Sequence, residues 1–244
     1  MSIENRKRRR RLLLSLVFIL SLVELGLLIA AYSTQHWVDA TPTRKVDKPI
    51  ADAAKNLSSS KLSGYVHLGL FVGVQSLDNG LGPRVVQIDV RAQVMADPPL
   101  FSFGLWVAML VFGLLTAAWA LVSAGFALLN IGRKPVRTLS GPAGLYLWNT
   151  CGLIACLAAI GVFLAAYFIS LSKNVLRQSD IDDYFWTSDG AAWLGMSFYL
   201  LVGCVPCVLV AHLFTWLAGG DLPCRRRDAL EKTRLEGMDA VIMY

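Results

Sequence analysis

Four long apolar runs constrain this chain more than any other feature of its sequence. A helix that crosses the roughly 30 Å hydrocarbon core of a bilayer needs about 20 predominantly apolar residues. Four stretches reach that length, and none of them contains a Lys or an Arg. We therefore predict four membrane-spanning helices, over residues 12–31, 104–131, 145–171 and 191–218.

The composition and the placement of the basic residues agree with a membrane protein. The chain is 55% apolar and 16% charged, whereas an average soluble domain is about 45–50% apolar and about 25% charged. The net charge of +6 could suggest nucleic-acid binding, but the positive-inside rule explains it better. With four crossings, the three basic clusters fall on one side and both termini are cytoplasmic; these clusters lie at residues 6–11, 133–137 and 225–227.

The first apolar run has an alternative interpretation, because a basic region followed by an apolar stretch is also the pattern of a signal peptide. This run is longer than the usual signal core, and it ends in YSTQHW without a small-x-small cleavage site. We interpret it as a retained span. The segments outside the spans are then the cytoplasmic basic N-terminus 1–11, an outside loop 32–103, a cytoplasmic loop 132–144, a second outside loop 172–190 and a cytoplasmic tail 219–244.

The first outside loop carries the pattern of a β-hairpin. In VVQIDVRAQV (85–94) apolar and polar residues alternate, which is the period of a half-buried strand. Upstream, residues 65–75 are apolar and β-rich apart from Gly69 and Gly73, and the following SLDNGLGP is dense in turn residues. We predict that 65–77 forms the first arm. Gly69 and Gly73 indicate a bulge or the close approach of another backbone.

The second outside loop is short and acidic, and we interpret it as a solvated loop. Calcium binding is a weaker alternative, because DIDD lacks a full set of oxygen ligands. The acidic residues are Asp180, Asp182, Asp183 and Asp189.

Glu24 is the only acidic residue inside any predicted span. A carboxyl group in a membrane is costly and is a functional hypothesis by default. Two interpretations stay open. Glu24 is either a structural group that hydrogen-bonds to Ser, Thr or Asn of a neighbouring helix, or a site of partner binding or ion sensing.

Three further features suggest modification or partner binding. Asn56 lies in the only N-x-S/T sequon with an allowed middle residue, so we predict N-glycosylation there. Cys224, beside three arginines just past the fourth span, is either a palmitoylation site or an unmodified cysteine. The terminal sequence, with Ile242 and Tyr244, is either a PDZ-domain ligand or a plain tail.

Catalytic and metal-binding patterns are missing from the sequence. It has no H-E-x-x-H, G-x-S-x-G, P-loop or Rossmann fingerprint. His36, His67 and His212 are scattered without a paired nucleophile. Cys204 and Cys207 lie in an apolar run without further ligands, and no cysteine falls in either outside loop. We predict no enzymatic activity, no cofactor, no metal site and no disulfide in the outside loops.

Several stretches resemble the clarin family, four-span relatives of the claudin and tetraspan superfamily. LSGPAGLYLWN (139–149) is similar to the clarin pattern VSGPGGICLWN, and LVSAGFALLN (121–130), GLFVG (69–73) and GLGPR (80–84) also resemble the family. The motif positions that carry the resemblance are Gly69, Leu70, Phe71, Gly73, Ser140, Gly141, Pro142, Gly144, Trp148 and Asn149.

The resemblance implies a mainly α membrane protein: a claudin-like bundle of four transmembrane helices with a small extracellular antiparallel β-sheet in the first loop. It also implies a plasma-membrane protein of mechanosensory cells that organises membrane partners and actin-linked proteins. Val74 stands where clarins carry a cysteine, so a disulfide-dependent adhesive surface is not implied. An auxiliary subunit of an ion channel and a claudin-type barrier protein remain alternatives.

Overall fold

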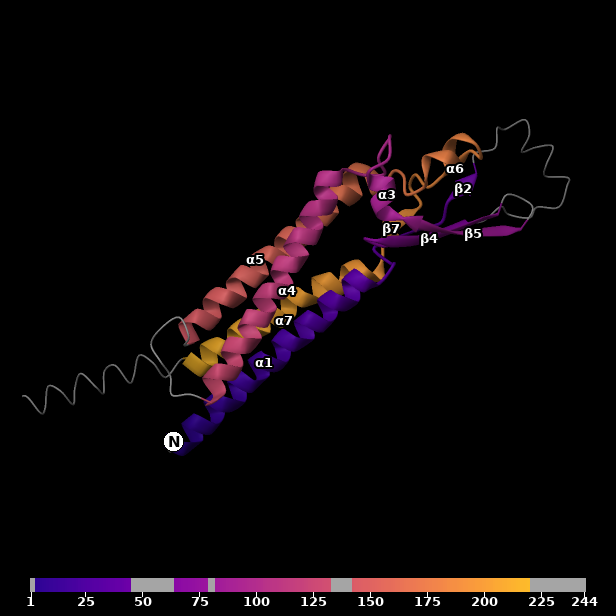
Figure 1. The fold of residues 1–244 in the computed structure, drawn as a ribbon. Coiled ribbons are helices and arrows are strands. Elements are labelled where there is room, and N and C mark those ends of the chain that lie inside the picture. Colours follow the sequence, from indigo (N-terminus) through magenta and orange to yellow (C-terminus); the bar gives the residue numbers. More distant parts are fainter. Residues whose placement is uncertain (1–2, 45–63, 79–81, 133–141, 220–244) are drawn as a thin grey trace, which may run out of the picture.

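In a computed structural model, the chain folds as a bundle of long helices with a small sheet at one end (Figure 1). The structure describes residues 3–44, 64–78, 82–132 and 142–219. Within them, four helices are long and apolar enough to cross a membrane, which confirms the predicted fold class. These are α1 (Ile3–Ser33), α4 (Phe103–Gly132), α5 (Pro142–Ala166), which continues as the π-helical turn η1 (Tyr167–Leu171), and α7 (Met196–Gly219).

Many of the small residues lie inside the bundle, and many large apolar side chains lie on its outer faces. Ala120 and Ala124 of α4 and Ala159 of α5 are buried, whereas Leu114 and Ile154 are exposed on the outer faces of the same two helices. Small side chains let helix backbones approach closely, and lipid tails solvate large apolar side chains as well as a protein interior does. This distribution therefore suits a bundle surrounded by lipid.

The sheet combines strands that follow α1 with a strand that precedes α7. It has five antiparallel strands in the order β5-β4-β3-β1-β7, and a separate two-stranded sheet pairs β2 with β6. The last strand, β7, comes from the segment just before α7 and pairs with β1. The strands are β1 (Val38–Ala40), β2 (Thr43–Arg44), β3 (Gly64–Leu68), β4 (Val72–Asp78), β5 (Pro83–Asp89), β6 (Trp186–Thr187) and β7 (Ala192–Leu194).

The predicted hairpin between β4 and β5 is present, with Gly73 opposite Ile88. The interpretation of residues 65–77 as one arm is wrong, however, because the chain turns at Gly69 and forms two strands, β3 and β4, that pair with each other. The strand pattern in residues 85–94 holds only as far as Asp89, because Val90–Val94 form the short helix α3. The Asp89 side chain caps this helix by accepting from the Ala92 N–H.

The turn at Gly69 requires glycine, as the predicted close approach implies. A Cβ at this position would collide with the carbonyl oxygen of Val72 and would lie 3.0 Å from the Cα of Gln35. Both neighbours are backbone atoms, which cannot move aside without shifting the strand or the end of α1. The turn is therefore packed directly against the backbone that follows α1.

The fourth long helix begins later than its apolar run. The run starts at Ala191, but residues 192–194 are extended and pair with β1, so the helix starts at Met196. Between α5 and β7 lies the short helix α6 (Gln178–Asp182).

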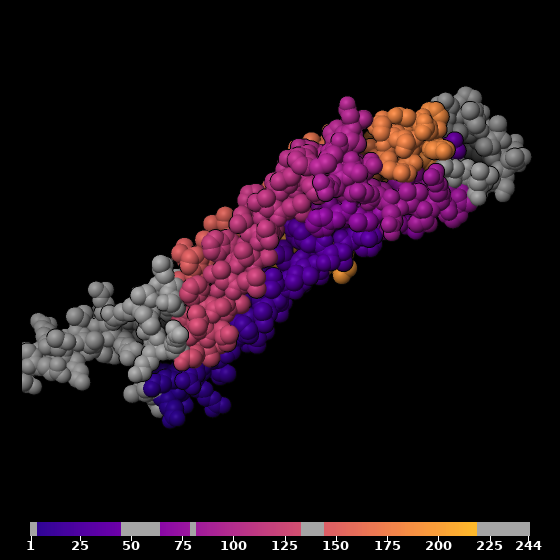
Figure 2. Space-filling view, in the orientation of Figure 1, coloured from indigo at the N-terminus to yellow at the C-terminus, as the bar shows by residue number. Residues whose placement is uncertain are grey.

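The acidic second loop is not uniformly solvated. Asp180 of α6 is buried. Its Oδ2 accepts a hydrogen bond from Nε2 of Gln75 in β4 at 2.7 Å, and Nε of Arg177 lies 3.1 Å from the same oxygen. Asp180 therefore fastens the second loop to the sheet, which the local charge pattern could not reveal. Figure 2 shows this loop and the sheet together at one end of an elongated body.

Replacing Gly69 with Ala should destabilise the protein. Forcing an extra carbon into a packed site usually costs about 1–3 kcal/mol. We expect thermal unfolding in mild detergent to begin at a clearly lower temperature than in the wild type. Gly26→Ala in α1 is the matched control, because a Cβ there meets no atom within 4 Å. Equal melting temperatures for the two variants would contradict the close packing at Gly69.

Candidate functional site at the junction of sheet and bundle

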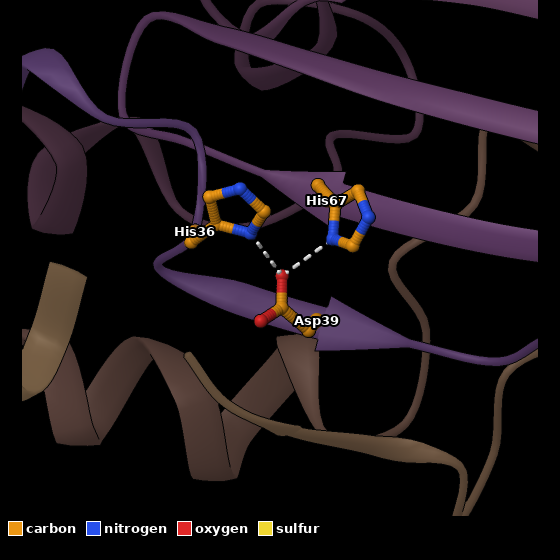
Figure 3. A group of neighbouring side chains, drawn as sticks. All are labelled: His36, Asp39 and His67. Carbon is orange, nitrogen blue, oxygen red and sulfur yellow. Dashed lines mark hydrogen bonds and ion pairs between the residues drawn. The ribbon is translucent and has the colours of Figure 1, made fainter. Parts of the chain in front are cut away.

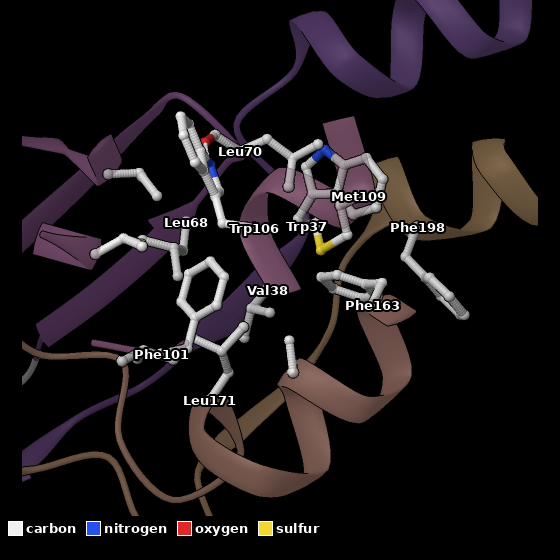
Figure 4. Packing of buried hydrophobic residues seen from close by; sticks show 14 of the residues in the cluster. Trp37, Val38, Leu68, Leu70, Phe101, Trp106, Met109, Phe163, Leu171 and Phe198 are labelled. Carbon is white, nitrogen blue, oxygen red and sulfur yellow. Dashed lines mark hydrogen bonds between the residues drawn. The ribbon is translucent and has the colours of Figure 1, made fainter. Parts of the chain in front are cut away.

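Trp37 joins the end of α1 to the start of the sheet. Its side chain is 1% exposed, and its Nε1–H donates to the carbonyl oxygen of Ala31 at 2.7 Å. Its ring packs edge-on against Phe163, with centroids 4.8 Å apart (Figure 4). It packs in the same way against Tyr32, with centroids 5.5 Å apart. Buried tryptophan is well accommodated when its polar N–H has a partner, so this residue packs sheet and helices into one core.

The Gly69-Leu70-Phe71 motif forms the turn that sits on the bundle. Leu70 is buried, and its carbonyl oxygen accepts a hydrogen bond from Nε1 of Trp106 in α4 at 2.8 Å (Figure 4). Phe71 is exposed, while its carbonyl accepts from the Val90 N–H at 3.0 Å. The motif thus binds the sheet to α4 through backbone atoms.

A third contact joins α1 to α4, close to Trp37 and Trp106. The hydroxyl of Tyr32 donates to the carbonyl oxygen of Met109 at 2.8 Å. Gly113, one turn further along α4, makes room for the Tyr32 ring, because a Cβ there would overlap it. Together with Trp37 and Trp106, this contact makes the sheet and the helix ends a single packed unit.

Trp148 and Asn149, at the end of the LSGPAGLYLWN motif, pack and form hydrogen bonds inside the bundle. Ser21 of α1 donates to Oγ of Ser123 in α4 at 3.2 Å, and Ser123 in turn donates to Oδ1 of the buried Asn149 in α5. The neighbouring Trp148 stacks on Trp119 of α4, with centroids 5.3 Å apart. Polar side chains that bond across helices in lipid stabilise a bundle by about 0.6 kcal/mol each.

Glu24 lies one turn after Ser21 and is buried between helices. Its carboxyl Oε1 has no hydrogen-bond partner among the described residues, so the expected bond to a Ser, Thr or Asn is not seen at that atom. Cys204 of α7 donates its thiol to the backbone oxygen of Glu24 at 3.6 Å, which places this residue against α7. A functional role for Glu24 stays a prediction.

Two of the three histidines meet on the sheet around one carboxylate. Oδ1 of Asp39 lies 3.0 Å from Nδ1 of His36 and 2.7 Å from Nδ1 of His67 (Figure 3). Asp39 in β1 and His67 in β3 are cross-strand partners, and His36 lies in the turn before β1. Among the described residues, this is the one group of three His, Cys, Asp or Glu side chains close enough to share a metal ion.

The sequence indicated only scattered histidines, because the group depends on strand register. Alternation in HWVDA and YVHLG does place Asp39 and His67 on the face opposite the buried residues of their strands. Which residues then stand side by side follows from a pairing across 28 residues of chain, and no local pattern specifies that pairing.

Several predicted residues lie outside the described part of the chain. They are Asn56, Ser140, Gly141, Cys224, Ile242 and Tyr244. Glycosylation, palmitoylation and the PDZ interaction therefore stay predictions. Pro142 begins α5 and Gly144 lies in its first turn, while Cys204 and Cys207 are free thiols in α7.

The comparisons with known proteins all find clarins. Residues 9–180, which include most of α1, all of α4 and α5, and strands β1 to β5, match the family described as Clarin-2-like. Clarin-2 of the mouse, Mus musculus, is 32% identical over 163 residues, which cover 66% of this chain and 68% of the relative. Human clarin-1 is 24% identical over 217 residues, covering 88% and 90%.

Removing the indole donor of Trp106 should weaken the junction. Trp106→Phe leaves the buried Leu70 carbonyl without its hydrogen bond, and an unsatisfied buried acceptor typically costs about 1–3 kcal/mol. We expect a lower free energy of unfolding in detergent. Trp193→Phe is the control, because that ring is 48% exposed. The junction account fails if Trp193→Phe is as destabilising as Trp106→Phe.

Proposed function

The chain belongs to the clarin family, and we propose that it is a non-enzymatic organiser in the plasma membrane of mechanosensory cells. It assembles complexes of other membrane proteins with actin-linked proteins, or delivers them to the cell surface. Family membership and four apolar helices support a multi-pass membrane protein of the sensory-cell type. The organising role and its partners are the proposed part.

The observation that carries this proposal is the packing of the sheet onto the bundle. Trp37, Leu70 and Trp106 join a folded sheet to helices whose outer faces are apolar. A protein bound to the sheet and a protein bound along the helices would then be held in one fixed arrangement. To hold two partners in a fixed arrangement, the protein needs a rigid junction between sheet and bundle, and it needs no catalytic group.

The arrangement of the chain ends supports the topology in this proposal. The described ends, Ile3 and Gly219, both lie at the end of the bundle opposite the sheet (Figure 1). The basic residues 6–11 lie at that same end, in the first turns of α1. Under the positive-inside rule this end is cytoplasmic, and the sheet is then extracellular.

Glycosylation of Asn56 provides a test of this topology. In cells, we expect the full chain to carry one N-glycan that peptide N-glycosidase removes as a single mobility shift. Ser58→Ala should abolish the shift by destroying the sequon, whereas Ser59→Ala, one residue outside it, should keep the shift. If the wild-type chain lacks the glycan and protease protection places Asn56 in the cytoplasm, the topology is inverted.

Affinity purification from sensory cells in mild detergent tests the organising role. We expect the epitope-tagged full chain to recover membrane and actin-linked proteins together. Trp106→Phe should recover less partner per copy at the cell surface, because it loosens the sheet by changing a buried ring and no exposed side chain. Recovery of one channel at a constant ratio, and nothing else, would favour an auxiliary channel subunit and contradict the proposal.

A further inference from the structure

We propose that His36, Asp39 and His67 form a binding site for one zinc ion. Imidazole nitrogen and carboxylate oxygen are ordinary ligands of zinc, and three protein ligands with water in the fourth position are a recurrent coordination of this metal. The site is independent of the organising role, since it depends only on the geometry of the sheet.

The ligand atoms already converge. Nδ1 of His36, Oδ1 of Asp39 and Nδ1 of His67 all lie within 4.8 Å of one another. Two ligands on a tetrahedral zinc ion, with bonds of about 2.0–2.2 Å, stand roughly 3.4 Å apart. The two distances to Asp39 are shorter than this, at 3.0 and 2.7 Å. To admit an ion between the three atoms, the two imidazole nitrogens must therefore move away from the Asp39 oxygen by roughly 0.4 and 0.7 Å.

The backbone holds the three ligands in place without a metal. Asp39 and His67 are neighbours in the paired strands β1 and β3. The backbone N–H of His36 donates to Oγ of Ser197, and its carbonyl accepts from the Ser197 N–H, at 3.2 and 2.9 Å. Gly195 makes this approach feasible, because a Cβ there would collide with the His36 carbonyl. Preorganised ligands reduce the entropic cost of binding.

The site is open to solvent on one side. The side chains of His36 and His67 are 47% and 35% exposed, while that of Asp39 is 16% exposed. Water can therefore reach the ion and take the fourth position. The carboxylate neutralises one of the two positive charges, so the bound ion keeps a net positive charge at the surface of the sheet.

Zinc binding exchanges hydrogen bonds for coordinate bonds. Without metal, the carboxylate oxygen of Asp39 accepts from Nδ1–H of both rings. Zinc needs the lone pair of each Nδ1, so a neutral ring moves its proton to Nε2, and a protonated ring releases one proton to water. The ion then joins the turn after α1 to strands β1 and β3. This turn also carries Trp37, so the metal would stabilise the junction.

Calorimetric titration of zinc into the full chain tests the site. The chain is purified in mild detergent with a peptide tag that contains no histidine and is stripped with a chelator. We expect one zinc ion per chain and a higher melting temperature with zinc, since a ligand that binds only the folded state stabilises it. His36→Gln and His67→Gln should each weaken binding by more than about tenfold, because even outer-shell losses cost about 10–100-fold.

His212→Gln is the matched control. It removes the third and last histidine of the chain, which lies in α7 beside Thr150, and it should leave zinc affinity unchanged. Melting without zinc shows whether each variant is folded. X-ray absorption at the zinc edge of the wild type gives an answer that needs no variant: nitrogen and oxygen neighbours with imidazole scattering are expected. Sulfur neighbours, or unchanged affinity in both His36→Gln and His67→Gln, would overturn the proposal.

Discussion

The hydrogen bond from the Trp106 indole to the Leu70 carbonyl is the contact on which the rest of the arrangement depends. It joins the sheet to α4 at a turn where Gly69 already packs against the backbone just after α1. No cysteine is available in the loops to cross-link the sheet. Packing around Trp37 and this backbone contact therefore take the place of a covalent link, and the sheet is stable because the bundle supports it.

Much of the fold could be predicted because it follows from local pattern. Span length identifies the long helices, and alternation identifies β5 over residues 85–89, although residues 90–94 continue the same alternation and form the helix α3. Features set by pairing between distant segments could not be predicted. Residues 192–194 belong to an apolar run that continues into α7, and only their pairing with β1 makes them a strand. The local sequence predicts a solvated Asp180, and only the structure shows that Gln75 of β4 donates a hydrogen bond to its carboxylate.

In the candidate site, too, some features could be predicted from the sequence and others depend on contacts between distant segments. The motif glycine at position 69 could be interpreted from sequence, since a glycine within a strand indicates a close backbone approach. The hydrogen bond that Ser123 donates to Asn149 could not be predicted, because it depends on how α5 packs against α4. The His36, Asp39 and His67 group was missed because it forms only through strand register. The sequence therefore indicated the Gly69 turn of the junction, but neither its contact with Trp106 nor the His36, Asp39 and His67 group.

Hydrogen exchange in lipid nanodiscs tests most directly whether sheet and bundle form one unit. The Trp37 and Gly69 amides donate to the carbonyls of Leu68 and Val72, and the Val90 amide donates to that of Phe71. Amides that open only with the whole structure exchange at the slow rate of its core. We predict that these three exchange as slowly as the amides of β3 and β4. Rapid exchange at the three amides, with β3 and β4 still protected, would contradict a rigid junction.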